Sequence, residues 1–174
     1  MRFEIAALSC ALACTIGAPR LIAADFFVST SGNNGNDGSD WNNAWATITY
    51  ALSQAQEGDR IMVAQGTYVP NTTDRTVSFV LKNDVDMFGG FEGVASGLDP
   101  SDRIPWMYDS ILSGEVLTAG IDDNTHHVVI AGDDITEATR LSGFVITAGN
   151  ADGTGTTSPA DSPIGGGMLI EGGH

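Results

Sequence analysis

The stretch Glu57-Gly-Asp-Arg-Ile-Met-Val-Ala-Gln-Gly-Thr-Tyr68 decides the fold. Its apolar run, residues 61–63, is short and lies between turn-forming Gly and Asp residues. A run of this length is too short for the strands of an ordinary hairpin sandwich. Its apolar side chains must be covered by other parts of the chain.

Similar short runs follow along the sequence, separated by Gly, Asn and Asp. We expect strands at residues 61–63, 78–81, 85–88, 110–112, 127–130, 143–147 and 167–170. These runs recur at intervals of about 16 to 25 residues, which is typical of stacked repeats. In such a solenoid, each repeat buries its apolar residues only when a neighbour stacks on it. A β-sandwich with irregular loops is the alternative.

Upstream of residue 57 the sequence predicts a strand at 26–29, a loop at 31–40 and a helix at 41–57. The loop is made of turn formers and contains no apolar residue. Trp45, Ile48, Ala51, Leu52 and Ala55 follow helical spacing, and a glycine stands where the helix would end. We expect this helix to cover an open sheet edge. Residues 25–59 then form an N-terminal cap, and residues 60–174 form the repeats.

Residues 1–24 have the layout of a secretory signal peptide cleaved after Ala24, although Glu4 is untypical of its charged start. The apolar run at 5–18 is shorter than the roughly 20 residues that cross a bilayer, which argues against the alternative of an uncleaved anchor. A lipoprotein signal ending at Cys14 would need a better small-residue box. Because Cys10 and Cys14 both lie in this segment, the mature chain contains no disulfide.

Length and charge exclude several classes of protein. The 174 residues suit one domain, and the net charge is −15. Loss of residues 1–24 leaves 21 acidic and five basic side chains, a net charge of −16. A chain this acidic is not expected to bind nucleic acid or an anionic membrane surface. After removal of the signal peptide, we expect no membrane-spanning segment.

The entry segment of the mature chain resembles a known class of protein. Residues 27–41 (FVSTSGNNGNDGSDW), 46–52 (ATITYAL) and 57–68 resemble the start of bacterial right-handed parallel β-helix proteins of the pectate-lyase-like superfold. Residues 141–150 (LSGFVITAGN) look like a later rung. Residues 165–170 (GGGMLI) are more weakly similar to polymorphic outer-membrane protein repeats, whose Phe-x-x-Asn motifs are missing here.

The resemblance implies an all-β, right-handed parallel β-helix with an N-terminal capping helix. Family members usually continue for many more rungs, so we expect a truncated N-terminal portion of a longer coil. The alternative is that the open C-terminal end is buried against a partner or a second copy. In a lyase, calcium ligands and a basic residue would be required, and in a galacturonan hydrolase Gly-His-Gly and Arg-x-Lys strings, which do not occur here.

Sites for metals have weak support in the sequence. Asn34, Asn36, Asp37 and Asp40 place oxygen ligands at alternating positions, loosely as in a calcium loop, but no bidentate Glu follows at the expected spacing. An Asx-rich turn is the alternative. His126 and His127 are adjacent and would point to opposite faces of a strand, which disfavours a shared zinc ion. We expect no cofactor, with calcium as the exception to test.

Aromatic side chains are the remaining candidates for a binding surface. Trp41, Trp45, Trp106 and Tyr108 could stack on sugar rings, although Trp45 lies on the apolar face of the predicted helix. Trp106 and Tyr108 fall in the Pro-flanked loop 100–110, the best place for a ligand. We identify no catalytic residue.

We therefore expect an exported, non-catalytic module, secreted or on the outer membrane or cell surface, that binds glycans or proteins in the manner of an adhesin. The alternative is the N-terminal part of a pectate-lyase-like enzyme, a polysaccharide lyase or glycoside hydrolase whose catalytic rungs lie downstream.

Overall fold

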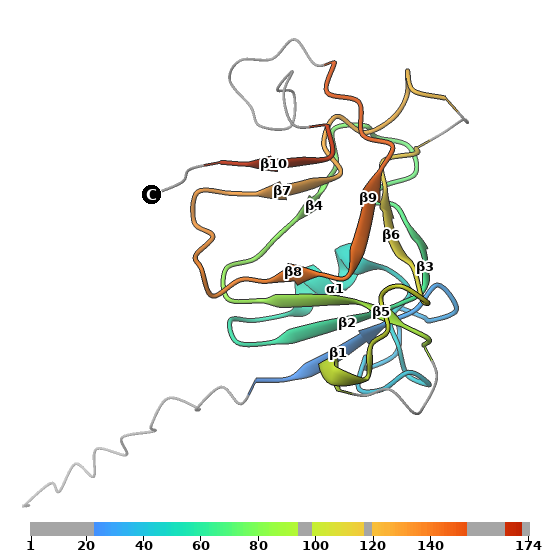
Figure 1. Cartoon of the computed structure of the whole chain (residues 1–174), viewed down its shortest axis with the longest axis vertical. Helices are drawn as coiled ribbons and strands as arrows, with labels where there is room; N and C mark the ends of the chain where they lie inside the picture. The colour runs from blue at the N-terminus through green and yellow to red at the C-terminus, as the bar shows by residue number, and fades with distance from the viewer. Residues whose placement is uncertain (1–22, 94–98, 117–119, 153–165, 172–174) are drawn as a thin grey trace, which may run out of the picture.

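The computed structural model describes residues 23–93, 99–116, 120–152 and 166–171. Within them the chain is mostly β, with three parallel sheets and one short α-helix (Figure 1). No helix in these ranges is long and apolar enough to cross a membrane. The expected signal peptide, including both cysteines, lies outside them except for residues 23 and 24.

The chain passes through three sheets in turn, and each passage adds a strand to the sheet. Sheet A contains β1 (Asp25–Val28), β2 (Arg60–Ala64), β5 (Asp86–Phe91) and β8 (Leu141–Ser142). Sheet B contains β3 (Gly66–Tyr68), β6 (Ser110–Ser113) and β9 (Phe144–Thr147). Sheet C contains β4 (Phe79–Val80), β7 (Val129–Ala131) and β10 (Met168–Ile170). The chain therefore passes through A, B and C three times, which is consistent with a β-helix solenoid and not with a sandwich.

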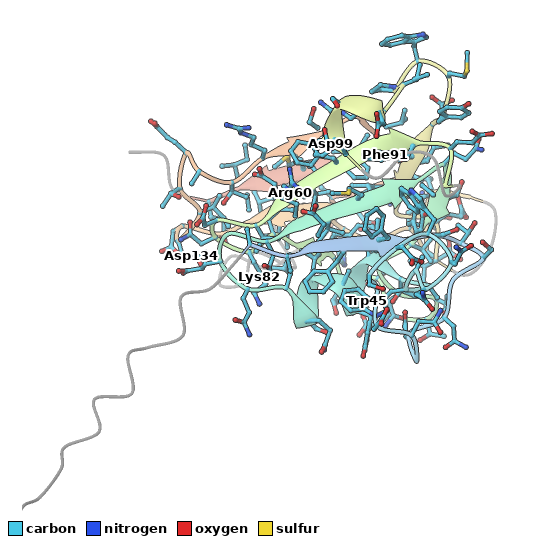
Figure 2. All side chains as sticks on the ribbon, turned by 90° about the horizontal axis from the view of Figure 1, so that it is seen from below. Trp45, Arg60, Lys82, Phe91, Asp99 and Asp134 are labelled. Atoms are coloured by element: carbon cyan, nitrogen blue, oxygen red, sulfur yellow. The ribbon has the colours of Figure 1, made fainter. Side chains whose placement is uncertain are left out.

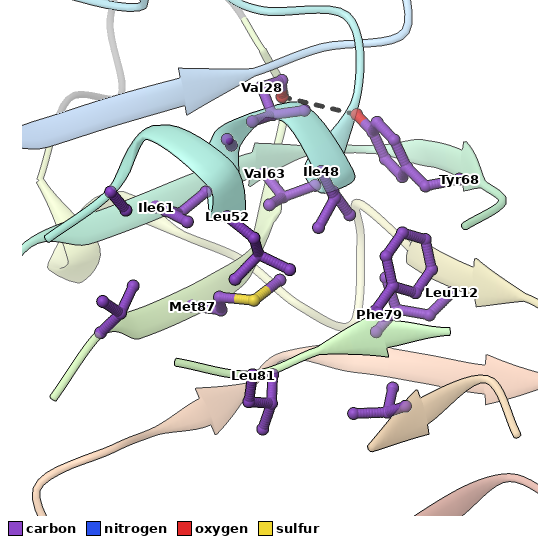
Figure 3. Close-up of a cluster of buried hydrophobic side chains, with 14 of the residues drawn as sticks. Val28, Ile48, Leu52, Ile61, Val63, Tyr68, Phe79, Leu81, Met87 and Leu112 are labelled. Atoms are coloured by element: carbon purple, nitrogen blue, oxygen red, sulfur yellow. Dashed lines mark hydrogen bonds between the residues drawn. The ribbon is translucent and has the colours of Figure 1, made fainter. Parts of the chain in front are cut away.

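Inward-pointing side chains stack in ladders from one rung to the next (Figure 3). In sheet B, Tyr68, Leu112 and Ile146 occupy equivalent positions in successive strands; Figure 3 labels the first two. In sheet C, Phe79, Val129 and Met168 do the same. Burying these apolar side chains supplies the main stabilising free energy of the coil. The Tyr68 hydroxyl donates to the Ala64 and Val28 carbonyl oxygens at 3.1 and 3.4 Å, so its polar atom is also satisfied.

The capping helix is shorter than the sequence predicts. Helix α1 spans Ile48–Gln54, not 41–57, and the Thr47 side chain caps it by accepting from the Tyr50 N–H. The preceding residues lie beside β1, where the Trp45 N–H donates to the Phe27 carbonyl at 2.8 Å and the Trp45 carbonyl accepts from Ser29. Helix α1 contacts β4 and β1. The edge of β1 is thus covered by residues of the predicted 41–57 segment that precede the helix, and the helix itself is shorter than predicted.

The predicted strands are found with shifted ends. The first strand is 25–28 instead of 26–29, and the run expected at 127–130 begins at Val129. The sequence did not predict β3 and β8 as separate strands. Both are very short: β3 follows β2 after the single-residue corner Gln65, and β8 precedes β9, from which Gly143 separates it. At the equivalent corner the spacing is much longer, since β5 ends at Phe91 and β6 begins at Ser110.

The outer face of sheet A carries a second apolar cluster. Phe27, Met62 and Phe88 occupy equivalent outward positions in β1, β2 and β5. Trp41 packs edge-on against Phe27, with ring centroids 4.8 Å apart, and lies 5.5 Å from the ring of Phe91. Left uncovered, such a row of apolar side chains would form an exposed patch that promotes association. Here the loops that cross the sheet pack on it.

Candidate ligand-binding loop

Residues 99–109 form a loop anchored on the outer side of sheet A. Asp99 begins the short 3-10 helix η1 (Pro100–Asp102) in a capping box, in which its side chain accepts from Ser101 and the Asp102 side chain accepts from the Asp99 N–H. The hydrogen bonds that Asp99 accepts from Ser101 lower its pKa. Figure 2 shows Asp99 near Arg60 of β2, whose positive charge also favours the ionised Asp99.

Arg103 fastens the middle of the loop to two rungs. Its guanidinium lies 5.0 Å from the centre of the Phe88 ring, in a cation–π contact with β5. It also donates to the Ser142 carbonyl and hydroxyl oxygens at 3.1 and 3.0 Å. The Ile104 N–H donates to the Gly90 carbonyl at 2.7 Å. The single basic side chain of residues 99–109 is therefore engaged against the outer face of sheet A.

A tight turn after this anchor exposes the aromatic residues. The Ile104 carbonyl accepts from both the Met107 and Tyr108 N–H groups, at 2.9 and 3.0 Å. Trp106 is 84% exposed and Met107 is 62% exposed, whereas Tyr108 is half-buried. Desolvation raises the pKa of Tyr108, as do the charge of Glu92 and a hydrogen bond to it. The Trp106 indole therefore lies in solvent on a turn whose backbone is hydrogen-bonded.

The other tryptophans are structural. Trp45 is 4% exposed, stacks on Phe26 with centroids 4.6 Å apart, and donates from its ring N–H to the Asn36 carbonyl at 2.9 Å. Its burial was predicted correctly, although it lies before the helix and not on it. Trp41 is 7% exposed in the outer cluster, so its candidacy as a sugar-stacking residue was wrong. Among the tryptophans, Trp106 alone presents its ring to solvent.

In the Asn/Asp loop (residues 31–40), the candidate calcium ligands form hydrogen bonds with backbone groups of the protein. The Asn34 Oδ1 accepts from the Ala46 and Thr47 N–H groups at 2.8 and 3.2 Å. The Asn36 side chain donates to the Ala44 carbonyl at 3.2 Å. These bonds fasten the loop to the segment that runs beside β1.

The two aspartates of this loop form Asx turns. The Asp37 Oδ1 accepts from the Ser39 N–H and hydroxyl at 3.0 and 2.7 Å, which lowers the pKa of Asp37. The Asp40 Oδ1 accepts from the N–H groups of Asn42 and Asn43 at 2.8 and 2.9 Å. In the described ranges no three His, Cys, Asp or Glu side chains are grouped to hold a metal ion.

Comparison with known proteins identifies the family. The family model described as "Protein of unknown function (DUF1565)" matches residues 30–164. The chain belongs to the DUF1565 family. No curated protein and no solved structure matches it.

The DUF1565 chain also contains a polar corner that the sequence did not reveal. Arg75 donates to Asp152 at 2.7 Å and to the Asn124 carbonyl at 3.0 Å. His126 Nδ1 lies 3.4 Å from the same Asp152 carboxylate. The three residues come from three successive rungs between sheets B and C. Their separation in the sequence leaves no motif that could have predicted the contact.

The remaining candidates of the DUF1565 chain have ordinary surroundings. His127 is fully buried and His126 nearly so. Asp133 and Asp134 are exposed in the turn between β7 and β8, as expected for a solvated corner. The structure therefore leaves the loop carrying Trp106 and Tyr108 as the best candidate for binding a ligand.

Proposed function

We propose that this protein is an exported, non-catalytic β-helix module that binds a glycan through Trp106 and Tyr108. The observation that carries the proposal is an 84% exposed indole on a loop held by hydrogen bonds and a cation–π contact. The flat apolar face of a sugar ring can stack on such an indole, with little conformational entropy lost because the backbone is already ordered.

The charges around the loop favour a glycan without acidic groups. Asp102 and Asp109 are exposed on either side of Trp106, while Arg103 is engaged with Phe88 and Ser142. A polyuronate would approach these carboxylates in the field of a chain with net charge −15. A neutral polysaccharide meets no such repulsion.

Export and the finer fold assignment belong to the same proposal. The signal-like residues 1–24 support secretion or display at the cell surface. The repeated A-B-C path and the helix beside β4 support a right-handed coil of the pectate-lyase-like superfold. A rigid coil of this kind would hold the aromatic loop away from the surface that carries it.

The test uses the tryptophans themselves. Because Trp41 and Trp45 are buried, quenching of fluorescence by acrylamide should arise mainly from Trp106. We expect neutral polysaccharides to protect this fluorescence and to retard the protein in affinity electrophoresis, and polygalacturonate to do neither. Trp106→Ala should abolish binding, and Trp106→Phe should weaken it.

The matched control is Ile121→Ala, which shortens an exposed apolar side chain elsewhere on the coil. It should bind like the wild type. If no polysaccharide protects Trp106, or if Trp106→Ala binds as well as Ile121→Ala, the proposed glycan site is wrong. Capture of a surface protein that depends on Trp106, without glycan binding, would replace the glycan by a protein ligand.

A further inference from the structure

The connection between β6 and β7 carries two buried oxygen atoms that accept no hydrogen bond. Glu115 follows the end of β6, and Asn124 precedes β7. Glu115 Oε1 and Asn124 Oδ1 are shielded from solvent, and among the described residues no group donates a hydrogen bond to either. Burying a polar atom in this way costs free energy, and the cost is larger for the charged oxygen of a carboxylate. The two atoms therefore indicate a ligand that compensates their burial.

The two oxygens belong to neighbouring segments of the folded connection. The Thr125 N–H donates to the Gly114 carbonyl at 2.8 Å, so the peptide bond after Asn124 lies beside the peptide bond before Glu115. Asn124 is 4% exposed, and its own carbonyl accepts from Arg75 at 3.0 Å. The Asn124 amide oxygen thus points into the protein from a backbone segment that hydrogen bonds already fix.

The charges of this connection favour a cation as the ligand. Asp122 and Asp123 add two carboxylates directly before Asn124, and residues 114–128 contain no Lys or Arg. Arg75 reaches this place from the preceding rung, but it donates to the Asn124 carbonyl and to a carboxylate of the next rung, and to neither buried oxygen. Oxygen ligands suit hard cations, and Ca²⁺ accepts amide and backbone carbonyl oxygens in irregular geometry more readily than Mg²⁺ does.

We propose that Glu115 and Asn124 bind a calcium ion through Glu115 Oε1 and Asn124 Oδ1. Backbone carbonyl oxygens and water supply the further ligands that Ca²⁺ needs. With only two side-chain ligands, we expect a Kd on the order of 1 mM, as in weak extracellular calcium sites. The bound ion ties the segment after β6 to the segment before β7, and so stabilises the crossing from sheet B to sheet C.

The test is thermal unfolding of the purified protein in the presence of calcium. The protein is first treated with EDTA and dialysed into about 0.15 M NaCl, which screens unspecific attraction of cations to the acidic surface. We expect about 10 mM CaCl₂ to raise the Tm by about 3–6 °C. The same concentration of MgCl₂ should raise it by less than half as much, because Mg²⁺ demands a more regular set of ligands.

Glu115→Gln is the decisive variant, because it separates an ion ligand from a carboxylate that stabilises the chain by itself. In EDTA it should be at least as stable as the wild type, since it removes a buried charge that no donor compensates. In calcium it should lose most of the rise in Tm, and Asn124→Ala should lose it as well. Asp122→Asn is the matched control: it removes the same charge from an exposed side chain of the same connection and should keep the full rise.

Several results would overturn the proposal. The wild type would have to show no response to calcium, or equal responses to calcium and magnesium. Equal rises in Glu115→Gln and Asp122→Asn would show that calcium acts only on the overall acidity of the chain. A Glu115→Gln variant clearly less stable than the wild type in EDTA would also contradict the site, because the carboxylate would then have a stabilising contact within the protein.

Discussion

At both ends of this coil the last strands have apolar side chains and a backbone edge that need a cover, and the two ends differ in how far they are covered. At the N-terminal end, Trp45 stacks on Phe26 and residues beside β1 satisfy its backbone edge. At the C-terminal end, Leu141, Ile146 and Met168 are only partly buried and β10 has no neighbour beyond it in the described residues. The comparison shows that rungs do not stabilise themselves: an inward side chain is buried only when something is stacked on both of its sides.

The largest expected effect contrasts a middle rung with the open end. Leu112 and Ile146 are ladder partners in sheet B, fully and partly buried respectively. Leu112→Ala should lower the free energy of unfolding by about 3 kcal/mol, through lost burial and a cavity. Ile146→Ala should lower it by about 1 kcal/mol, because part of its surface is already in water. Urea denaturation of dilute protein measures both. Equal losses would show that the end is covered.

An intermediate effect is expected at the closed end. Asn34→Ala removes the acceptor of the Ala46 and Thr47 N–H groups, and should lower the free energy of unfolding by about 1–2 kcal/mol. Asn42→Ala, at an exposed position of the same loop, is the control and should change it by less than about 0.5 kcal/mol. If the two substitutions had the same effect, the loop would not depend on Asn34 to hold its place beside β1.

The smallest expected effect is a pH dependence of the same cap. The pKa of Asp37 is lowered by its hydrogen bonds with Ser39, so this carboxylate stabilises the folded state above its ordinary pKa of 3.8. That contribution is lost as the pH falls through the lower pKa of the folded state. Asp37→Asn should therefore make the free energy of unfolding less dependent on pH between about 2 and 4. An unchanged pH profile in urea titrations would contradict this role.

The sequence predicted the repeats better than it predicted the joints between them. Short apolar runs at irregular intervals indicated stacked rungs because each strand is buried by its neighbours and needs no long alternating pattern. The helix was predicted too long because Trp45 and Ile48 are both buried, and spacing alone does not show that only the second belongs to a helix. The same spacing of apolar residues was produced by a helix that starts at residue 48 and by the extended segment beside β1 that precedes it.

The composition of residues 100–110 predicted a surface loop, but it did not predict the loop's contacts or which of its side chains are exposed. Proline residues and clustered aromatics indicated a surface loop, whereas the exposure of Trp106 and the burial of Trp41 depend on which faces sheet A leaves available. Arg103 could not be placed either, since its contacts with Phe88 and Ser142 join positions from different rungs. The same holds for the contact of Arg75 with Asp152.

The corner between sheets A and B shows how such a protein could change a surface loop without changing its architecture. One residue makes this corner at Gln65 and again at Gly143, yet in the rung between them β5 ends at Phe91 and β6 begins only at Ser110. Sheet B continues past it in register, because Gly66 to Tyr68, Ser110 to Leu112 and Phe144 to Ile146 still align. Such a corner can accept a new loop, or lose one, while the core remains intact, so recognition and stability can evolve as separate traits.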